Sequence, residues 1–230
     1  MYYLNRIYSY ITTDIAAKQI LNMAHLYYIH DPMCSWCWGF RPVLEVLLSR
    51  LPDNITSSRL LGGLAADSSQ PMPDDLRMRL QSTWRKIGKR IPSTRFNFDF
   101  WARNTPRRST YPACRAVIAA RSIDPEMEDN MIVAIQQAYY LQARNPSDDT
   151  TLIELAMELG LNEQQFSKLL NHSSTQQKLD SEIAQSFLLG VRSFPSLVLQ
   201  HEESYWPVAI DYLNAEPMLE LIHNLIDTDF

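Results

Sequence analysis

The chain has 230 residues, of which 46% are apolar and 20% are charged, so it can bury one core of good size or a core with a helical subdomain. This composition excludes a disordered or fibrous chain, and three cysteines are too few for the disulfide scaffold of a small secreted protein. The net charge is −5 and no recognition motif accompanies the arginines, so we expect no binding of nucleic acid.

The first 22 residues contain no apolar run long enough for the core of a signal peptide, because Asp14 and Lys18 interrupt their second half. Two interpretations stay open: an extension or misassigned start ahead of Met23, or a short packed helix with apolar residues at helical spacing from Leu4 to Ile15. No segment approaches the roughly 20 apolar residues of a membrane span. We therefore expect a cytoplasmic protein that does not interact with membranes.

The sequence Cys34-Ser35-Trp36-Cys37 lies between a predicted strand over 25–30 and a predicted helix over 38–50. Two thiols at this spacing can change between dithiol and disulfide without rearranging the rest of a protein. The free N–H groups at a helix N-terminus favour a thiolate. Because the intervening Ser35-Trp36 brings no His or Lys, we expect the helix N-terminus to be the main cause of acidity at Cys34. Cys34 is then the attacking sulfur and Cys37 the resolving thiol.

A zinc half-site is the alternative for these two cysteines. Tetrahedral zinc needs two further ligands, and neither Cys114 nor the five histidines show a second paired spacing, so we expect no metal. Asp31 lies three residues before Cys34, near enough to accept a proton from Cys37 or to tune the thiolate. An acidic residue of the turn is the other interpretation of Asp31.

A second strand is predicted over 55–61, ending at Gly62-Gly63, and helical patterns dominate from 65 to 171, with about five small helices interrupted by prolines. Cys114 follows a predicted helix start, so it is either a thiol of low pKa or, with alanines around it, a buried packing residue. The aromatic residues Phe96, Phe98 and Phe100 belong either to a core or to a substrate groove.

The stretch 77–121 holds 12 of the 21 basic residues and one acidic residue, Asp99. It indicates either subdomains of opposite charge or an anion site near the thiols, which could receive the carboxylates of glutathione or an acidic partner. After it, a helix over 174–189, strands over 197–200 and 204–208, and a helix over 217–225 are predicted.

Two motifs resemble the DsbA-like family of thiol:disulfide oxidoreductases, most closely its branch of predicted protein-disulfide isomerases. They are Asp-Pro-Met-Cys-Ser-Trp-Cys-Trp-Gly-Phe at 31–40 and Gly-Val-Arg-Ser-Phe-Pro-Ser-Leu-Val-Leu at 190–199, with support from Tyr-Pro-Ala-Cys-Arg-Ala at 111–116. The resemblance implies an α/β chain, namely a thioredoxin-like fold with an inserted all-helical subdomain. The thioredoxin-like domain then comprises 23–63 and 172–230, the insertion 64–171, and 1–22 lie outside both.

The resemblance also implies a substrate site beside the dithiol. From the sequence alone, Pro195 is expected to follow an ordinary trans peptide bond at the start of a strand. In the resembled family this proline is cis and faces the dithiol, and the backbone of the preceding residue, here Phe194, pairs with the substrate chain. Phe194 departs from the small or β-branched residue common at that position. We expect Trp36 to be exposed at this substrate site and Trp38 to be buried.

These observations favour a thiol-disulfide oxidoreductase or isomerase that needs no bound cofactor and acts on protein or small-molecule disulfides, with glutathione as a candidate partner. The alternative enzyme is a glutathione-dependent isomerase or transferase on the same scaffold, since kappa-class transferases and chromene-carboxylate isomerases share it. A third alternative is a binding module whose basic stretch docks an acidic partner.

Overall fold

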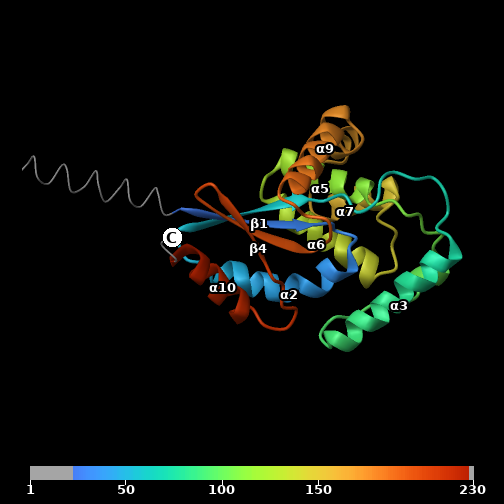
Figure 1. Ribbon diagram of the computed structural model, residues 1–230. Coiled ribbons are helices and arrows are strands. Elements are labelled where there is room, and N and C mark those ends of the chain that lie inside the picture. The colour runs from blue at the N-terminus through green and yellow to red at the C-terminus, as the bar shows by residue number, and fades with distance from the viewer. Residues whose placement is uncertain (1–22, 228–230) are drawn as a thin grey trace, which may run out of the picture. The chain divides into compact units, whose positions relative to one another are not determined.

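The computed structural model describes residues 23–227 (Figure 1). The predictions for residues 1–22 therefore lie outside the described part of the chain. The elements follow in this order: β1 (Ala24–His30), α2 (Ser35–Ser49), β2 (Ile55–Leu61), α3 (Asp74–Arg90), α4 (Phe100–Arg103), α5 (Tyr111–Ile123), α6 (Met127–Tyr140), α7 (Asp149–Glu158), α8 (Glu163–Leu170), α9 (Ser173–Leu188), β3 (Ser196–His201), β4 (Ser204–Val208) and α10 (Glu216–Asp227).

The four strands form one sheet in the order β2-β1-β3-β4, so β1 and β3 are its inner strands. Side chains of β1 alternate between buried and half-buried at first, and its last three residues are all buried. β3 and β4 form an antiparallel hairpin in which Leu197 lies opposite Val208. The predicted order of strand, helix, strand, then helix, hairpin and helix is confirmed, and with it the thioredoxin-like α/β fold.

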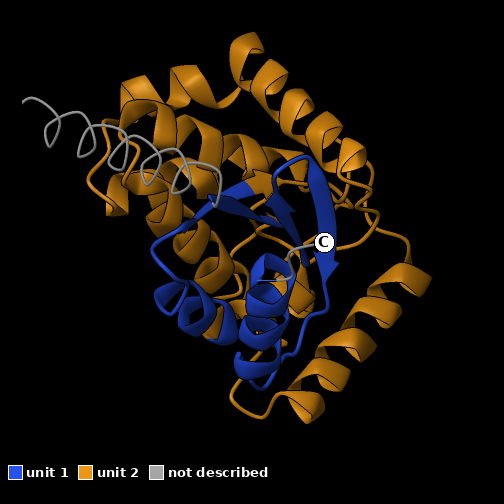
Figure 2. Cartoon of the chain, turned by 60° about the vertical axis from the view of Figure 1, so that its left-hand side comes forward, with its two compact units in different colours: residues 1–28, 43–59, 196–230 blue, residues 29–42, 60–195 orange. Residues whose placement is uncertain are grey.

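The described chain divides into two compact units (Figure 2). Among the described residues, the first comprises 23–28, 43–59 and 196–227, and the second comprises 29–42 and 60–195. Within the first unit, α10 and the end of α2 lie on the same side of the strands (Figures 1 and 2). The Arg50 guanidinium binds the Glu216 carboxylate at 2.8 Å, which joins the end of α2 to the start of α10.

The second unit is built around α5, which contacts α6, α7, α8 and α9. Every residue from 112 to 120 is buried, and four alanines among them let the neighbouring helices approach closely. The six helices between 65 and 171 include one that the sequence did not predict, the four-residue α4. The side chain of Asn162 caps the start of α8, because it accepts a hydrogen bond from the backbone N–H of Gln165.

The aromatic residues of this unit gather around Trp84, which is buried. Phe96 stacks on Trp84 with ring centroids 5.0 Å apart, and Phe100 is tilted against it at 6.1 Å. Phe98 meets the edge of the same indole at 5.7 Å while remaining partly exposed. Of the two interpretations of these phenylalanines, the core is the one confirmed for Phe96 and Phe100. No helix within residues 23–227 has the length and apolar character needed to cross a membrane.

Candidate active site

The two cysteines of the Cys-Ser-Trp-Cys sequence lie one helical turn apart. Cys34 immediately precedes α2, and Cys37 lies in the first turn of that helix. The Asp31 carbonyl accepts a hydrogen bond from the backbone N–H of Cys34 at 3.0 Å, and the Cys34 carbonyl accepts one from the N–H of Trp38. Both sulfurs are free thiols; Cys34 is 6% exposed and Cys37 is fully buried. Only Cys34 has contact with solvent.

The environment of Cys34 lowers the pKa of its thiol. The hydrogen bond from the Cys37 thiol is the main cause, and the backbone N–H groups of Cys37 and Trp36 add to it, against the opposing effects of burial and of the Asp31 charge. The pKa of Cys37 is raised well above the usual range, first by burial and then because this thiol donates to Cys34. The structure thus corrects one expectation: the helix N-terminus contributes, but the neighbouring thiol contributes more.

The peptide bond between Phe194 and Pro195 is cis, as the family resemblance implies and contrary to the expectation from the sequence alone. The Phe194 carbonyl accepts a hydrogen bond from the Cys34 thiol at 3.5 Å. The phenyl ring of Phe194 lies against Gly62, where a Cβ atom would overlap it. Gly62 itself follows β2, and its N–H donates to the His30 carbonyl at 2.7 Å. The structure therefore brings the cis-proline loop to the Cys34 sulfur.

Asp31 is fully buried and accepts four hydrogen bonds, two of them from the backbone N–H groups of Met33 and Leu64 at 2.8 Å. The other two come from the Thr110 hydroxyl at 2.6 Å and the Cys114 thiol at 3.5 Å. Burial raises the pKa of Asp31, and the four hydrogen bonds oppose that rise. The Asp31 charge in turn raises the pKa of both Cys34 and Cys37.

Cys114 is fully buried among the alanines of α5, which confirms the packing interpretation. Burial and the adjacent Asp31 raise the pKa of Cys114 well above the usual range, so the alternative of a thiol with low pKa is wrong. Thr110 and Gly62 are the residues of this site that the sequence did not single out. A threonine directly before a helix and a glycine after a strand have ordinary local explanations, so neither carried a signal of function.

The two tryptophans differ from expectation, because both are half-buried. The Arg90 guanidinium lies over the ring of Trp36 at 5.9 Å from its centroid. Trp38 stacks on Tyr140 at 5.6 Å, and the Tyr140 hydroxyl donates to the Met33 carbonyl at 2.7 Å. These contacts fix the turn that precedes Cys34. In the described part of the chain, no three His, Cys, Asp or Glu residues gather as a metal site would require.

Six of the twelve basic residues in the stretch 77–121 form ion pairs with carboxylates of the same compact unit, counted over residues 23–227. The pairs are Arg77 with Asp74, Arg79 with Asp75, Arg103 with Asp99, Arg107 with Asp148, Arg115 with Asp67, and Arg121 with Glu128 and Glu182. Arg115 is the most buried of these six, and its pair is bidentate. At least half of the basic residues in this stretch are therefore engaged in structural contacts.

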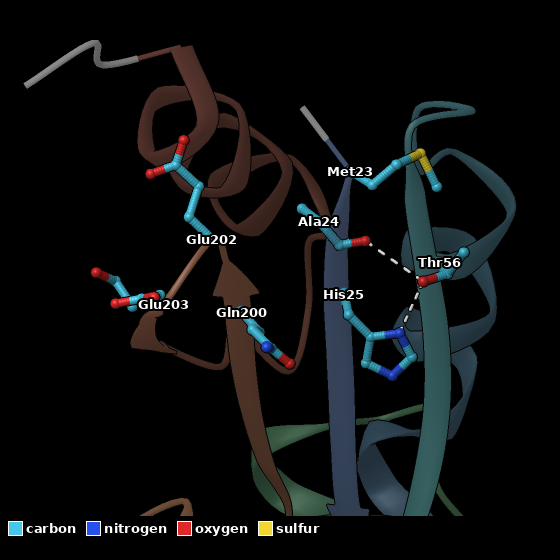
Figure 3. A pocket seen from close by; sticks show the side chains of 8 residues that line it. Met23, Ala24, His25, Thr56, Gln200, Glu202 and Glu203 are labelled. Atoms are coloured by element: carbon cyan, nitrogen blue, oxygen red, sulfur yellow. Dashed lines mark hydrogen bonds between the residues drawn. The ribbon is translucent and has the colours of Figure 1, made fainter. Parts of the chain in front are cut away.

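A pocket of about 800 Å³ lies in the first unit, at the beginning of β1 and beside the β3–β4 turn (Figure 3). His25 and Thr56 line it and share a hydrogen bond of 2.7 Å, while Glu202 and Glu203 lie across from them. The dithiol, Phe194 and Pro195 all belong to the second unit, so this pocket contains none of the candidate site residues.

A dithiol at a helix start, a cis-proline loop beside Cys34 and a buried carboxylate on a thioredoxin-like fold form the arrangement expected of the class of thiol:disulfide oxidoreductases. The chain belongs to the thioredoxin family, because the family model described as Thioredoxin matches residues 27–210.

Several individual proteins are similar to this chain. A protein of Nitrosomonas europaea, provisionally described as a protein disulfide isomerase, is 26% identical with a TM-score of 0.77, over 90% of this chain and 100% of that one. The cytosolic disulfide reductase DsbM of Pseudomonas aeruginosa, solved also with GSH, is 23% identical with a TM-score of 0.70, over 87% of this chain and 98% of that one. The ClpXP adapter protein SpxH of Bacillus subtilis is 23% identical over 77% of this chain, which spans 60% of the length of SpxH.

Proposed function

We propose that this protein catalyses thiol–disulfide exchange with Cys34 as the attacking and Cys37 as the resolving sulfur. The observation that carries the proposal is the difference between the two thiols. Cys34 has a lowered pKa, some solvent contact and a hydrogen bond to the Phe194 carbonyl, whereas Cys37 is fully buried with a raised pKa. An attacking thiolate and a protected second thiol are the two groups that disulfide exchange requires.

The reaction proceeds in two exchanges. The Cys34 thiolate attacks one sulfur of the substrate disulfide, so the Cys34–substrate bond forms while the substrate S–S bond breaks and its second sulfur leaves as a thiolate. Cys37 then loses its proton and attacks the Cys34 sulfur. The Cys34–Cys37 disulfide forms and the remaining substrate sulfur leaves, with the substrate reduced by two electrons and the enzyme oxidised. The backbone of Phe194 beside Pro195 holds the substrate chain, and Trp36 forms part of the same site.

The direction of exchange and the partners follow from the relatives as part of this proposal. The structural relative DsbM is named a cytosolic disulfide reductase and has been solved with GSH. A reductase or isomerase of protein or small-molecule disulfides, regenerated by glutathione in the cytoplasm, fits the lowered pKa of Cys34, because a stabilised thiolate attacks disulfides at neutral pH.

Replacing Cys37 tests the mechanism. With a disulfide-linked peptide as substrate, Cys37→Ser should stop the enzyme at a stable Cys34–peptide disulfide, because the second exchange has lost its nucleophile. Turnover should fall at least about 100-fold, and the adduct should appear by mass. Cys34→Ser is the matched control and should give neither turnover nor adduct. Multiple turnover by Cys37→Ser at the wild-type rate would contradict the proposed roles.

A second candidate function, glutathione-dependent isomerisation or transfer, is favoured by the guanidinium of Arg90 over Trp36, two residues beyond Cys34. Arginine near a thiol site could bind a carboxylate of glutathione. The same Cys37→Ser variant separates the candidates, because transfer through glutathione needs a single thiol-directing residue and should survive the substitution.

A further inference from the structure

The Asp31 carboxylate has more hydrogen-bond donors than a turn residue needs. Its Oδ1 accepts the N–H of Met33, and its Oδ2 accepts the N–H of Leu64, the O–H of Thr110 and the S–H of Cys114. A buried carboxylate without such donors would be neutral. The two backbone N–H groups can only donate hydrogen bonds, so the groups around Asp31 stabilise its ionised form.

Thr110 uses its hydroxyl in an unusual way. It precedes α5, where a threonine normally accepts a hydrogen bond from the helix, yet its side chain makes no such cap. Its oxygen instead accepts the N–H of Ala65 at 3.0 Å, which leaves its single proton for Asp31. The Ala65 carbonyl lies 3.4 Å from the same hydroxyl, but it already accepts the N–H groups of Thr110 and Tyr111. The Thr110 proton is therefore committed to Asp31.

Cys114 supplies the fourth donor. It lies one turn into α5, where its N–H bonds the Thr110 carbonyl, so one helix start positions both side chains. Its thiol is fully buried and keeps its proton, because burial and Asp31 raise its pKa. A protonated thiol facing a carboxylate can only donate. The dithiol mechanism does not involve Cys114, and the hydrogen bond that its thiol donates to Asp31 indicates a role for it at the site.

We propose that Thr110 and Cys114 are positioning residues for disulfide exchange, holding the Asp31 carboxylate fixed and charged so that it takes the proton of Cys37 in the second exchange. This inference rests on the proposed function. In that step the S–H bond of Cys37 breaks, the proton passes to Asp31, and the new thiolate attacks the Cys34 sulfur while the substrate thiolate leaves.

Several titratable groups face Asp31 from the elements packed around it, and no arginine or lysine forms an ion pair with it in residues 23–227. Cys34 and Cys37 lie at the start of α2. Tyr111 and Cys114 belong to α5, where Arg115 lies beside Cys114, and Tyr139 and Tyr140 belong to α6. His30 adjoins Asp31 in the chain. Burial raises the pKa of the three tyrosines, so at neutral pH they add no charge. The three tyrosines therefore do not contribute to changes of the exchange profile near neutral pH, and the variants below assign those changes to Asp31.

The test follows both exchanges with the aromatic disulfide dithiobis(nitrobenzoate) by stopped flow across a pH series. Attack by Cys34 releases a first thionitrobenzoate, and attack by Cys37 releases the second. Thr110→Val removes the hydroxyl and keeps the shape, so the acid limb of the second release should move up by about one pH unit, since a lost donor raises the pKa of Asp31. The first release should be no slower, because less negative charge near Cys34 favours its thiolate.

Matched variants separate this effect from general loosening of the structure, which would slow both releases. Thr110→Ser keeps the hydroxyl and should retain the wild-type profile. Cys114→Ala should shift the second release in the same direction by less, and it carries the test if Thr110→Val does not fold. Thr175→Val removes another buried threonine hydroxyl, in the first turn of α9, and should leave both profiles unchanged.

Two results distinguish failure of this inference from failure of the proposed function. Wild-type profiles in Thr110→Val and Cys114→Ala, with an altered second release in Asp31→Asn, would overturn the positioning roles and leave dithiol exchange intact. An unaltered second release in Asp31→Asn would overturn the role of Asp31 and with it the inference. No second release from the wild-type protein would overturn dithiol exchange itself.

Discussion

At the scale of single residues, one helical turn separates two cysteines with opposite properties. Cys34 lies before the helix and receives hydrogen bonds, which stabilise its thiolate. Cys37 lies in the first turn and is fully buried, and its thiol donates a hydrogen bond to the Cys34 sulfur. The same chemical group thus has a lowered pKa in one position and a raised pKa in the other, because their hydrogen bonds and burial differ.

This difference predicts selective alkylation. With a brief pulse of iodoacetamide on the reduced native protein, Cys34 should react at pH values below 9.0, the usual thiol pKa, whereas Cys37 and Cys114 should not. The sign follows from the shifts, since a lowered pKa gives thiolate at neutral pH and a raised pKa withholds it. Mass analysis of peptides reports the modified residue. Denatured protein, in which all three react alike, is the control, and equal labelling of Cys114 in the native protein would contradict the assignment.

The residues of the site divide by what the sequence could reveal. Cys34, Cys37 and Asp31 lie within seven residues of one another, so their common position was predicted. Thr110 and Cys114 are 79 and 83 residues from Asp31 in the sequence, and no local sequence pattern predicts a contact between residues so far apart. The exposure of Trp36 was mispredicted because it depends on the distant Arg90. The catalytic and substrate-binding assignments themselves remain predictions.

At the scale of elements, the end of β2 supports the cis-proline loop. A Cβ atom on Gly62 would overlap the ring of Phe194, and the Phe194 carbonyl is the acceptor of the Cys34 thiol. Leu61, the last residue of β2, is held in turn by Glu182, which accepts its N–H at 2.8 Å. An absent side chain at Gly62 therefore determines where the loop lies beside Cys34.

Gly62→Ala should consequently impair exchange. The methyl group forces the Phe194 ring away, moving the carbonyl beside Cys34, so kcat/KM for a disulfide peptide should fall about 10-fold or more and stability by about 1–3 kcal/mol. Gly88→Ala is the matched control, because its nearest neighbour, the Thr94 carbonyl, is 3.8 Å from the added Cβ. It should keep full activity and raise the stability of α3 by about 0.5–1 kcal/mol. Unchanged activity in Gly62→Ala would contradict the support role.

The elements were predicted well where periodicity is strong. The strand at 25–30 and the hairpin of 197–200 and 204–208 appear close to their predicted bounds. The four-residue α4 was missed because one helical turn shows no period, and its first residue, Phe100, continues the alternation of Phe96 and Phe98 that is typical of a strand. The cis bond before Pro195 required the family resemblance, since nothing in Phe-Pro itself favours cis.

At the scale of the whole molecule, the buried thiols link stability to pH. The folded protein keeps Cys37 and Cys114 protonated above the usual thiol pKa, whereas the unfolded chain releases both protons near 9.0. The contribution of these two thiols to the free energy of unfolding is fully present below pH 9 and is lost as the pH rises above 9. Cys34, with its lowered pKa, acts in the opposite direction.

The free energy of unfolding of the reduced protein should therefore decrease above pH 9. Each of the two buried thiols contributes a slope of about 1.4 kcal/mol per pH unit, and Cys34 does not add to the loss. Urea unfolding at several pH values measures the slope. Cys114→Ala removes one contribution and should flatten the curve, so an identical slope in that variant would argue against a protonated thiol at Cys114.

The overall fold class followed from the order of predicted elements and the family resemblance, and the family model confirms it. The proposed division into 23–63 with 172–230 and 64–171 remains a prediction. The use of the basic stretch needed the structure, because carboxylates such as Asp148 and Glu182 that pair with its arginines lie outside it in sequence.

The most direct test of the central claim equilibrates the protein with a series of glutathione redox buffers, followed by acid quenching, alkylation under denaturing conditions and mass analysis. We expect one reversible disulfide, between Cys34 and Cys37, with Cys114 alkylated throughout, and a potential at or below that of glutaredoxins, about −200 to −230 mV, as suits a reductase. Failure to form the Cys34–Cys37 bond, or a disulfide that includes Cys114, would contradict dithiol exchange by this pair.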